Sequence, residues 1–273
     1  MSDRLSAGFE MILGGENMRA DADPPILLPP NEYLLSETIR RAYADCVHVS
    51  VLGGETAHVP GPAADGVVVS TSAIRARIEP SPEDFVVKVG SGVTPEAAET
   101  AVEKAGLVFP LDMGSSSSAT VGGAFMTNAR SAVERGYGAF RDTVIGVRCI
   151  SAGGAVITGG GRTAKNVTGY DLPRFFAGTM GLFGIAFELT IKAQPQPESR
   201  RAVVARFPGG ASAAAAVSDL LAIRGMPSFF DVRAPEGLGG VVTISLGFDG
   251  LAGVVDRSTG DACNRAESAG AAS

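Results

Sequence analysis

Hydrophobic positions along the chain follow two periods, one typical of helices and one typical of strands. Helical spacing marks residues 31–46 and residues 94–106, the second with Thr94 as its N-cap and Gly106 just past its end. Short apolar or alternating runs predict strands at 47–52, 66–70 and 184–197, and hairpins at 76–89 and 143–160.

The pattern changes after the prolines at positions 195 and 197. From there it predicts a strand, a helix, two strands and a helix, at 202–207, 211–224, 228–233, 240–247 and 250–269. A ferredoxin-like unit has this order and one more strand. We therefore expect an N-terminal extension (1–25), a large domain (26–197) and a short, incomplete third region (198–273).

Composition narrows the classes of function. The chain has 273 residues, 45% of them hydrophobic, and a net charge of −6 without a Lys/Arg block, which argues against nucleic-acid binding. No apolar run is long enough to span a membrane, and the N-terminus lacks the features of an export signal. We expect a cytoplasmic protein that reaches the inner membrane only through a complex.

Cysteine and histidine limit the chemistry. Cys46, Cys149 and Cys263 are far apart and odd in number, so we expect free thiols rather than a disulfide framework, a metal site or an iron–sulfur cluster. Both histidines, His48 and His58, lie in the first quarter of the chain. No residue after 58 can use an imidazole as base or metal ligand.

Glycine is abundant, with 36 residues, and it clusters in loops. The first cluster is VLGGETAHVPG (51–61), in which Gly53 and Gly54 precede Glu55 and Thr56. A glycine turn followed by a hydroxyl is typical of phosphate binding, whereas a carboxylate in its middle opposes a phosphate. An anion site, a former anion site and a plain turn all remain open on these residues alone.

Three later stretches offer further main chain to a ligand. In VFPLDMGSSSSATVGGAFMTNA (108–129), serines precede a helix expected to start near Thr120, and its N–H groups could face a pyrophosphate, although a flexible linker is the alternative. GGRTAKNVTGYD (160–171) is a glycine-bounded loop. AGTMGLFGI (177–185) lets backbone pass close to a planar ligand, or forms a bend. None of them matches a Walker loop or a dinucleotide fingerprint.

Taken in order, these motifs resemble a known family. The glycine loop (53–56), VKVGSGVTPEAAETAVEKAGLVFPLDMG, ATVGGAFMTN, YGAFRDTVIG, KNVTGYD and GTMGLFGIAFELTIKAQPQP are similar to the FAD-binding domain of the vanillyl-alcohol oxidase/p-cresol methylhydroxylase (PCMH) type. The resemblance runs from about residue 26 to residue 197. Within the family it is strongest to the FAD-binding subunit of bacterial glycolate oxidase and to D-lactate dehydrogenase-like proteins, through GGRTAKNVTGYDLPRFFAGTMGLFGI.

The resemblance implies two α+β subdomains that hold an extended FAD, followed by a cap domain, which here would be truncated and ferredoxin-like. It implies that two loops hold the pyrophosphate, through Gly53, Gly54, Glu55, Thr56, Gly114, Ser115, Ser117 and Ser118. It implies that the flavin and ribityl side contacts Thr120, Gly122, Gly123 and Asn128, with backbone from Gly181, Gly184 and Ile185. The family also implies structural roles for Lys165, Tyr170 and Asp171.

The chain departs from the family pattern in three places. Glu55 stands where the glycine loop usually has its second glycine, and Ser131 stands at another glycine position. Residues 198–273 contain no histidine, the usual base for hydroxy-acid oxidation. Five arginines there could hold a carboxylate: Arg200, Arg201, Arg206, Arg224 and Arg233. Asp231 is a carboxylate on a strand, and no catalytic residue can be named.

These observations favour an FAD-binding subunit of a multi-subunit 2-hydroxy-acid dehydrogenase of the glycolate or lactate type, which supports or relays flavin electron transfer. The family implies a catalytic flavoprotein subunit and an iron–sulfur subunit as partners. One alternative is a self-sufficient FAD-dependent oxidoreductase. Another is a structural pseudo-subunit that has lost FAD, and Glu55 is the reason to consider it.

Overall fold

The computed structural model describes residues 2–56, 66–75, 77–113, 118–161, 170–225, 227–234 and 240–272. The chain divides into two compact units. The first unit comprises Met1–Phe109, Met113–Ala129 and Phe140–Gln194, and the second comprises Pro110–Asp112, Arg130–Ala139 and Pro195–Ser273. Among the described helices, none has the length and apolar character needed to cross a membrane.

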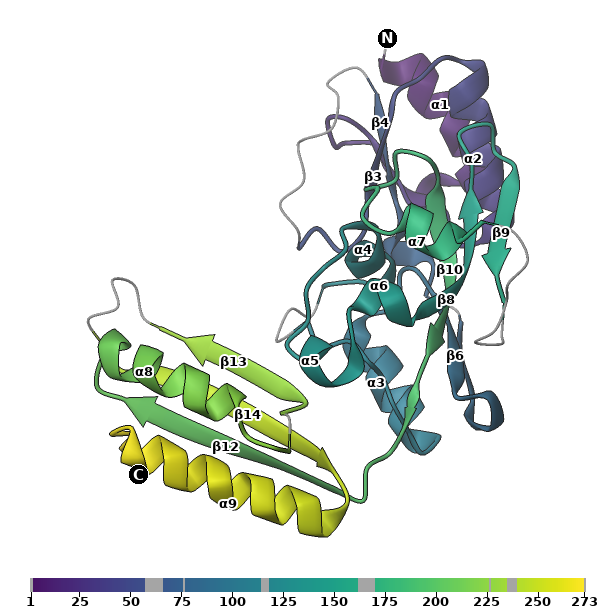
Figure 1. The fold of residues 1–273 in the computed structure, drawn as a ribbon. Helices are drawn as coiled ribbons and strands as arrows, with labels where there is room; N and C mark the ends of the chain where they lie inside the picture. The colour runs from purple at the N-terminus through teal and green to yellow at the C-terminus, as the bar shows by residue number, and fades with distance from the viewer. Residues whose placement is uncertain are drawn as a thin grey trace. The chain divides into compact units, whose positions relative to one another are not determined.

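The first unit begins with a small mixed sheet and two helices (Figure 1). The strand order is β1-β2-β4-β3, and both β2 and β3 run parallel to β4. The bounds are α1 (Ser2–Leu13), β1 (Met18–Arg19), β2 (Ile26–Leu27), α2 (Glu32–Ala44), β3 (Val49–Leu52) and β4 (Val67–Ser70). Helices α1 and α2 pack together, and Phe9, Leu27 and Leu35 are fully buried in the core that they share with the sheet.

A five-stranded antiparallel sheet forms the rest of this unit, in the order β5-β6-β10-β8-β9. Its strands are β5 (Ile78–Ser81), β6 (Val86–Gly90), β8 (Val144–Ile150), β9 (Val156–Gly160) and β10 (Ile185–Lys192). Both expected hairpins, β5–β6 and β8–β9, are confirmed. The central strand β10 pairs with β6 and β8 on its two edges and is buried on both faces up to its last residue.

Short helices and turns connect these sheets. They are α3 (Pro95–Lys104), α4 (Val121–Met126), α6 (Phe140–Thr143), α7 (Leu172–Phe176) and the 3-10 turns η1 (Gly15–Asn17), η2 (Thr71–Ala73) and η3 (Pro82–Asp84). The short strands β7 (Leu107–Val108) and β11 (Gln194–Pro195) lie outside the sheets described above. The expected cap of α3 is confirmed, since the Thr94 side chain accepts a hydrogen bond from the Ala97 amide at 3.3 Å.

The second unit has a three-stranded antiparallel sheet in the order β12-β14-β13, with two helices on one face. Its elements are α5 (Glu134–Tyr137), β12 (Ser199–Phe207), α8 (Gly210–Leu221), β13 (Phe229–Arg233), β14 (Val242–Gly250) and α9 (Ala252–Ser268). The expected order strand–helix–strand–strand–helix is confirmed. Alternate residues of β12, namely Val203, Ala205 and Phe207, enter the core beneath α8 and α9.

Candidate functional site

The glycine loop at residues 53–56 follows directly from β3. Two hydroxyls at the end of β4 hold the backbone just before the loop: Thr71 Oγ1 donates to the Leu52 carbonyl at 3.3 Å, and Ser70 Oγ donates to the Gly53 carbonyl at 3.4 Å. The parallel pairing of β3 with β4 therefore fixes where the loop starts.

Gly53 and Gly54 allow this loop to touch a second segment of backbone. A Cβ on Gly54 would overlap the carbonyl oxygen of Ser118, and a Cβ on Gly53 would lie 2.6 Å from Thr120 Oγ1. Neither position has room for a side chain. The loop thus packs directly against residues 118–120, and the structure brings together these members of the two expected pyrophosphate loops.

The amide groups of Gly54, Glu55 and Thr56 have no backbone partner among the described residues. In the described part of the chain, no acceptor lies within hydrogen-bond reach of the amides of Gly54, Glu55 and Thr56. Successive unpaired N–H groups at a turn form a concave site that attracts anions. This arrangement favours the anion-binding interpretation of the loop over the plain turn.

Glu55 keeps the backbone conformation that a glycine would adopt easily. Its φ is 60°, in the left-handed region, which costs an L-residue roughly 1–2 kcal/mol. The residue is exposed and lies at the border of the cavity described below. The loop therefore retains its shape with Glu55 in place, and the carboxylate stands at the solvent side of the site.

The start of α4 does not offer its amides in the same way. The amide of Val121 donates to the Val93 carbonyl at 2.8 Å, and that of Gly122 donates to the Ser91 carbonyl at 2.9 Å. The third amide, of Gly123, donates to Thr120 Oγ1 at 3.1 Å. The expectation that these N–H groups face a pyrophosphate was wrong, because the residues 91–93 and the N-cap already use them.

A cavity of about 120 Å³ lies between the loop, α4 and the start of β10. Of the residues expected to contact FAD, it is lined by Gly53, Gly54, Glu55, Thr56, Thr120, Gly122, Gly123 and Ile185. Glu55 is the only ionisable side chain in the described lining. The remainder of the wall is mostly alanine and methionine, which suits a flat, largely apolar ring system.

Three methionines in this wall were not singled out from the sequence. Met113, Met126 and Met180 all line the cavity. Met180 has a φ of 52°, and its amide donates to the Met126 carbonyl at 2.8 Å, so the turn after α7 is fixed against the end of α4. The glycines on either side of Met180 were the available signal, since they indicated a turn that can hold such a residue.

Gly181 and Gly184 lie at a second cavity, of about 260 Å³, instead of the first. Its lining includes Tyr43 and His48, and it shares Val51 and Ile185 with the first cavity. Gly181 has a φ of 85°, and a Cβ there would lie 2.8 Å from Val51 Cγ2. The two cavities therefore meet at one wall that the glycine-rich turn closely approaches.

Other expected residues are placed differently or lie outside the described residues. Asn128 has a φ of 50° and forms the turn after α4, but it does not line either cavity. Ser118 contacts Gly54 without lining the first cavity. Three members of the serine loop and the lysine of KNVTGYD fall outside the described residues: Gly114, Ser115, Ser117 and Lys165.

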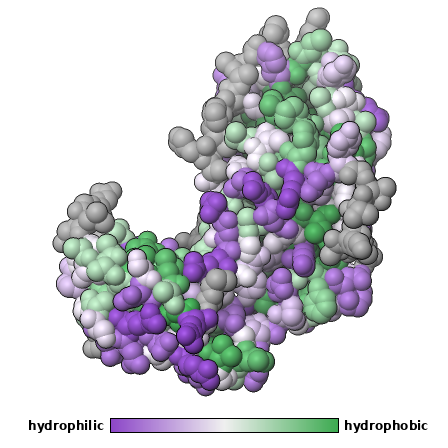
Figure 2. All heavy atoms as spheres, in the orientation of Figure 1, coloured by the Kyte–Doolittle hydropathy of each residue, from purple (hydrophilic) through white to green (hydrophobic). Residues whose placement is uncertain are grey.

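The end of KNVTGYD and the turn after α7 expose large apolar side chains. Asp171 caps α7 by accepting a hydrogen bond from the Arg174 amide at 3.2 Å, which is a structural role. Tyr170 is 94% exposed and Leu182 is 77% exposed, and Phe175 stacks near Phe183 at a centroid distance of 5.2 Å. Figure 2 shows hydrophobic residues at the surface in the region of α7.

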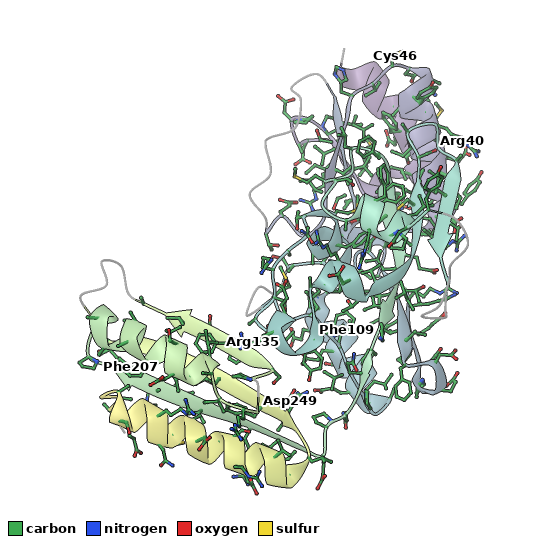
Figure 3. All side chains as sticks on the ribbon, viewed as in Figure 1. Arg40, Cys46, Phe109, Arg135, Phe207 and Asp249 are labelled. Atoms are coloured by element: carbon green, nitrogen blue, oxygen red, sulfur yellow. The ribbon has the colours of Figure 1, made fainter. Side chains whose placement is uncertain are left out.

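The second unit contains a cluster of ionisable side chains. Asp249, at the end of β14 (Figure 3), accepts a hydrogen bond from Tyr137 of α5 and pairs with Arg200 of β12 at 3.3 Å. Burial, together with the hydrogen bond to Asp249, raises the pKa of Tyr137 to about 12. Tyr137 therefore stays protonated in neutral solution.

The remaining polar candidates of this unit are largely structural. Ser131, at the unusual glycine position, both accepts from the Asp112 amide at 2.9 Å and donates to the Asp112 carbonyl at 3.0 Å. Asp231 pairs with Arg233 at 2.8 Å, so it is a poor candidate for a base. Arg201 pairs with Asp256 of α9 at 3.1 Å.

The cysteines and the possible metal ligands are scattered in the part of the chain that the structure describes. No three residues of the types His, Cys, Asp and Glu gather there at a spacing that could hold a metal ion. All three cysteines are free thiols, and burial raises the pKa of Cys149 to about 12.

Comparison with known proteins gives the family context. Residues 25–160 match the family described as "FAD binding domain". The glycolate oxidase subunit GlcD of Bacillus subtilis (strain 168) is 35% identical over 167 residues, which is 61% of this chain and 36% of that protein. The D-lactate dehydrogenase of Archaeoglobus fulgidus is 30% identical over 219 residues, covering 76% of this chain and 49% of that protein.

Two further comparisons extend this context. The mitochondrial D-2-hydroxyglutarate dehydrogenase of Bos taurus is 29% identical over 67% of this chain and 34% of that protein. The structure of alkyldihydroxyacetonephosphate synthase superposes with a TM-score of 0.83 at 15% identity, covering 98% of this chain and 60% of that one, which shows a shared fold. The chain thus spans between about a third and a half of the length of these curated relatives.

Proposed function

We propose that this chain binds FAD, because residues 25–160 match the FAD-binding domain family of the PCMH type and the chain is distantly homologous to glycolate oxidase subunit GlcD and to D-lactate dehydrogenases. We propose that it does so as a component of a 2-hydroxy-acid dehydrogenase of the glycolate or lactate type. The second unit would serve as the ferredoxin-like cap of that component.

The observation that carries this proposal is that the amides of Gly54, Glu55 and Thr56 have no partner among the described residues. They lie at the rim of a cavity with small and apolar walls, and glycine is required at positions 53 and 54 for the loop to reach Ser118 and Thr120. A pyrophosphate needs hydrogen-bond donors at a place where backbone can approach closely. The residues present therefore fit the pyrophosphate of FAD.

The two cavities adjoin each other, as a site for an extended dinucleotide requires. Each is smaller than the roughly 300–1,000 Å³ typical of sites for drug-sized ligands. They share the wall of Val51 and Ile185, so an extended molecule could use both. Bound FAD would supply hydride acceptance, while the glycine loop would hold its pyrophosphate and the methionine-lined wall would exclude water from the ring.

The role proposed within the enzyme is support or relay of flavin electron transfer. Oxidation of a hydroxy acid needs a base for the hydroxyl proton, and residues 198–273 contain no histidine. A catalytic flavoprotein subunit and an iron–sulfur subunit are the partners that we propose. The free thiols at Cys46 and Cys263 agree with a cytoplasmic setting, where thiols stay reduced.

Glu55 supports one competing function, a structural pseudo-subunit that keeps the fold without FAD. Glu55 belongs to the glycine loop whose amides we propose as the phosphate site, and it lines the same cavity. Repulsion there would lower affinity for FAD, although the exposure of the residue weakens the effect through solvent screening.

Purification followed by FAD titration tests these functions. Flavin absorbance in the purified chain, or quenching of FAD fluorescence on titration, is the expected result. A colourless chain that takes up no FAD would leave only the pseudo-subunit. Turnover of glycolate or D-lactate by the isolated flavin-loaded chain with an artificial acceptor would instead show a self-sufficient oxidoreductase and contradict the relay role.

A further inference from the structure

Three of the seven methionines of the chain line the first cavity, a concentration that its composition does not predict. They differ in how far solvent reaches them, since Met180 is 52% exposed, Met113 is partly buried and Met126 is buried. A methionine thioether can be oxidised to a sulfoxide, which converts an apolar side chain into a polar one, and reductases reverse the change. Met180 is the methionine of this wall that a dissolved oxidant reaches most easily.

The backbone at Met180 is fixed in an uncommon conformation. Its φ of 52° lies in the left-handed region, which a residue other than glycine rarely adopts. Two hydrogen bonds hold this turn against the end of α4: the Gly178 amide donates to the Phe125 carbonyl at 3.1 Å, and the Met180 amide donates to the Met126 carbonyl at 2.8 Å. Because the main chain is held in this way, a change in the Met180 side chain is not relieved by a simple shift of the turn.

The described wall of the first cavity suits a thioether better than a sulfoxide. Most of its side chains are small or apolar. Two of its threonine hydroxyls are already engaged, because Thr71 Oγ1 donates to the Leu52 carbonyl at 3.3 Å and Thr127 Oγ1 donates to the Gly123 carbonyl at 2.8 Å. A sulfoxide oxygen accepts hydrogen bonds from water, and covering it without a new donor is unfavourable. Oxidation here should therefore weaken the binding of a ring that packs on this wall.

We propose that Met180 is a site of reversible oxidation that controls how tightly the chain holds FAD. The inference rests on the function proposed above, in which FAD lies against this wall. The oxidant is hydrogen peroxide. One peroxide oxygen forms a bond to the Met180 sulfur as the O–O bond breaks, and the other oxygen takes up the remaining proton and leaves as water. The sulfur loses two electrons and the peroxide gains them.

Peroxide treatment of the full chain tests this site. Mass spectrometry measures the sulfoxide at each methionine, and FAD fluorescence titration measures affinity before and after treatment. Met11 of α1 is 81% exposed and lines neither cavity, so it is the internal control. We expect both Met11 and Met180 to be oxidised and FAD affinity to fall at least fivefold. A mixture of methionine sulfoxide reductases that act on the two sulfoxide epimers should restore the affinity.

Two matched variants assign the effect to one sulfur. Met180→Leu and Met11→Leu each remove one thioether with little change in volume. Each variant is compared with its own untreated sample, so that a difference in starting affinity does not enter the result. Met180→Leu should abolish the effect of peroxide, whereas Met11→Leu should retain it. Met180→Gln places a polar group at a similar length, and without oxidant it should bind FAD at least fivefold more weakly than Met180→Leu does.

The outcomes separate this inference from the function on which it rests. An equal loss of affinity in Met180→Leu, or unchanged affinity in a sample whose Met180 is oxidised, would overturn the proposal. Resistance of Met180 to peroxide under conditions that oxidise Met11 would overturn it as well. A chain that takes up no FAD before treatment contradicts the proposed function, and this inference with it. A chain that binds FAD and is indifferent to oxidation contradicts this inference alone.

Discussion

The two units present different kinds of groups to a ligand. The first unit offers backbone amides, glycines and methionines around its first cavity, where Glu55 is the only ionisable side chain among the described residues. The second unit offers ionisable side chains on a sheet, with Tyr137, Asp249 and Arg200 in one cluster. Binding in the first should therefore depend on shape, and the properties of the second on charge.

The difference has a physical reason. Backbone amides hold a phosphate without a counter-charge only where the chain can approach closely, so each Cβ matters. A cluster of charged side chains tolerates changes of shape but depends on its partners, because an unpaired charge is costly when it is partly buried. Variants in the two units should thus lose different properties.

Gly54→Ala should give the largest effect. The added Cβ would overlap the Ser118 carbonyl, so the loop must move away from residues 118–120 and its amides with it. We expect FAD retention to fall by more than tenfold, which is about 1.4 kcal/mol or more. FAD fluorescence titration measures the loss. Gly260→Ala, at a helical position with open space, is the control and should not alter FAD binding.

Asp249→Ala should destabilise the second unit without affecting FAD. The change leaves the Tyr137 hydroxyl and the Arg200 guanidinium without their shared acceptor, at a cost of about 2 kcal/mol. Urea unfolding followed by circular dichroism measures it. Asp231→Ala removes a more exposed pair with Arg233 and should cost less than about 1 kcal/mol. If both variants weaken FAD binding, the assumption that charges of the second unit do not affect FAD binding by the first unit is wrong.

The sequence predicted the structure well where it depends on residues that are close together along the chain. The two hairpins, the Thr94 cap and the element order after residue 198 follow from local patterns, and all are present. The engagement of the α4 amides was not predictable in this way. Its acceptors, Ser91 and Val93, lie about thirty residues earlier, at and just after the turn at 90–92, and no local pattern links that turn to α4.

The contents of the cavity wall were also beyond local patterns. Met113, Met126 and Met180 come from three separate segments, and no single stretch of sequence shows that they meet. The core beneath α1 is similar, since Phe9 and Leu13 are buried only because α1 packs on α2. Glycine clusters indicated where close approach occurs, but not which segments approach each other.

Thr120→Val tests whether the anion binds at the glycine loop (53–56) or at the start of α4. The variant removes the N-cap acceptor of the Gly123 amide and should cost about 1 kcal/mol of stability, whereas Thr120→Ser should retain it. FAD affinity should change by less than about threefold, or roughly 0.7 kcal/mol, because the α4 amides are not the anion site. A tenfold loss of affinity at unchanged stability would place the anion at α4 after all.

Part of the pH dependence of stability should report on the second unit, through Tyr137, while buried Cys149 of the first unit, whose pKa is also raised to about 12, contributes over an overlapping alkaline range. The pKa of Tyr137 is raised from 10.0 to about 12, so below about pH 10 the tyrosine is protonated in both states and its contribution is complete. Between about pH 10 and about pH 12 the unfolded state ionises first, and stability falls. Because the residue is only half-buried, we expect a loss of about 1 kcal/mol or less. Tyr137→Phe should remove this part of the decline in urea unfolding.

Glu55→Gly should give the smallest change. Glycine relieves the left-handed conformation, worth roughly 1–2 kcal/mol, but loses about 0.5–1 kcal/mol through the greater freedom of the unfolded chain. The net gain in stability should therefore be small. Because the residue is exposed, removing its charge should strengthen FAD binding by less than about threefold, and less still at high salt.

Glu55→Gln separates the two effects of that residue, since it removes the charge and keeps the strained backbone. If Glu55→Gly and Glu55→Gln both increase FAD affinity tenfold or more, the carboxylate opposes the phosphate and the pseudo-subunit becomes the better hypothesis. If only the glycine variant gains, the loop is limited by its conformation. If neither variant gains affinity, the backbone amides of the first unit bind the anion and the solvated Glu55 carboxylate does not affect the binding. The contrast between the two units then stands.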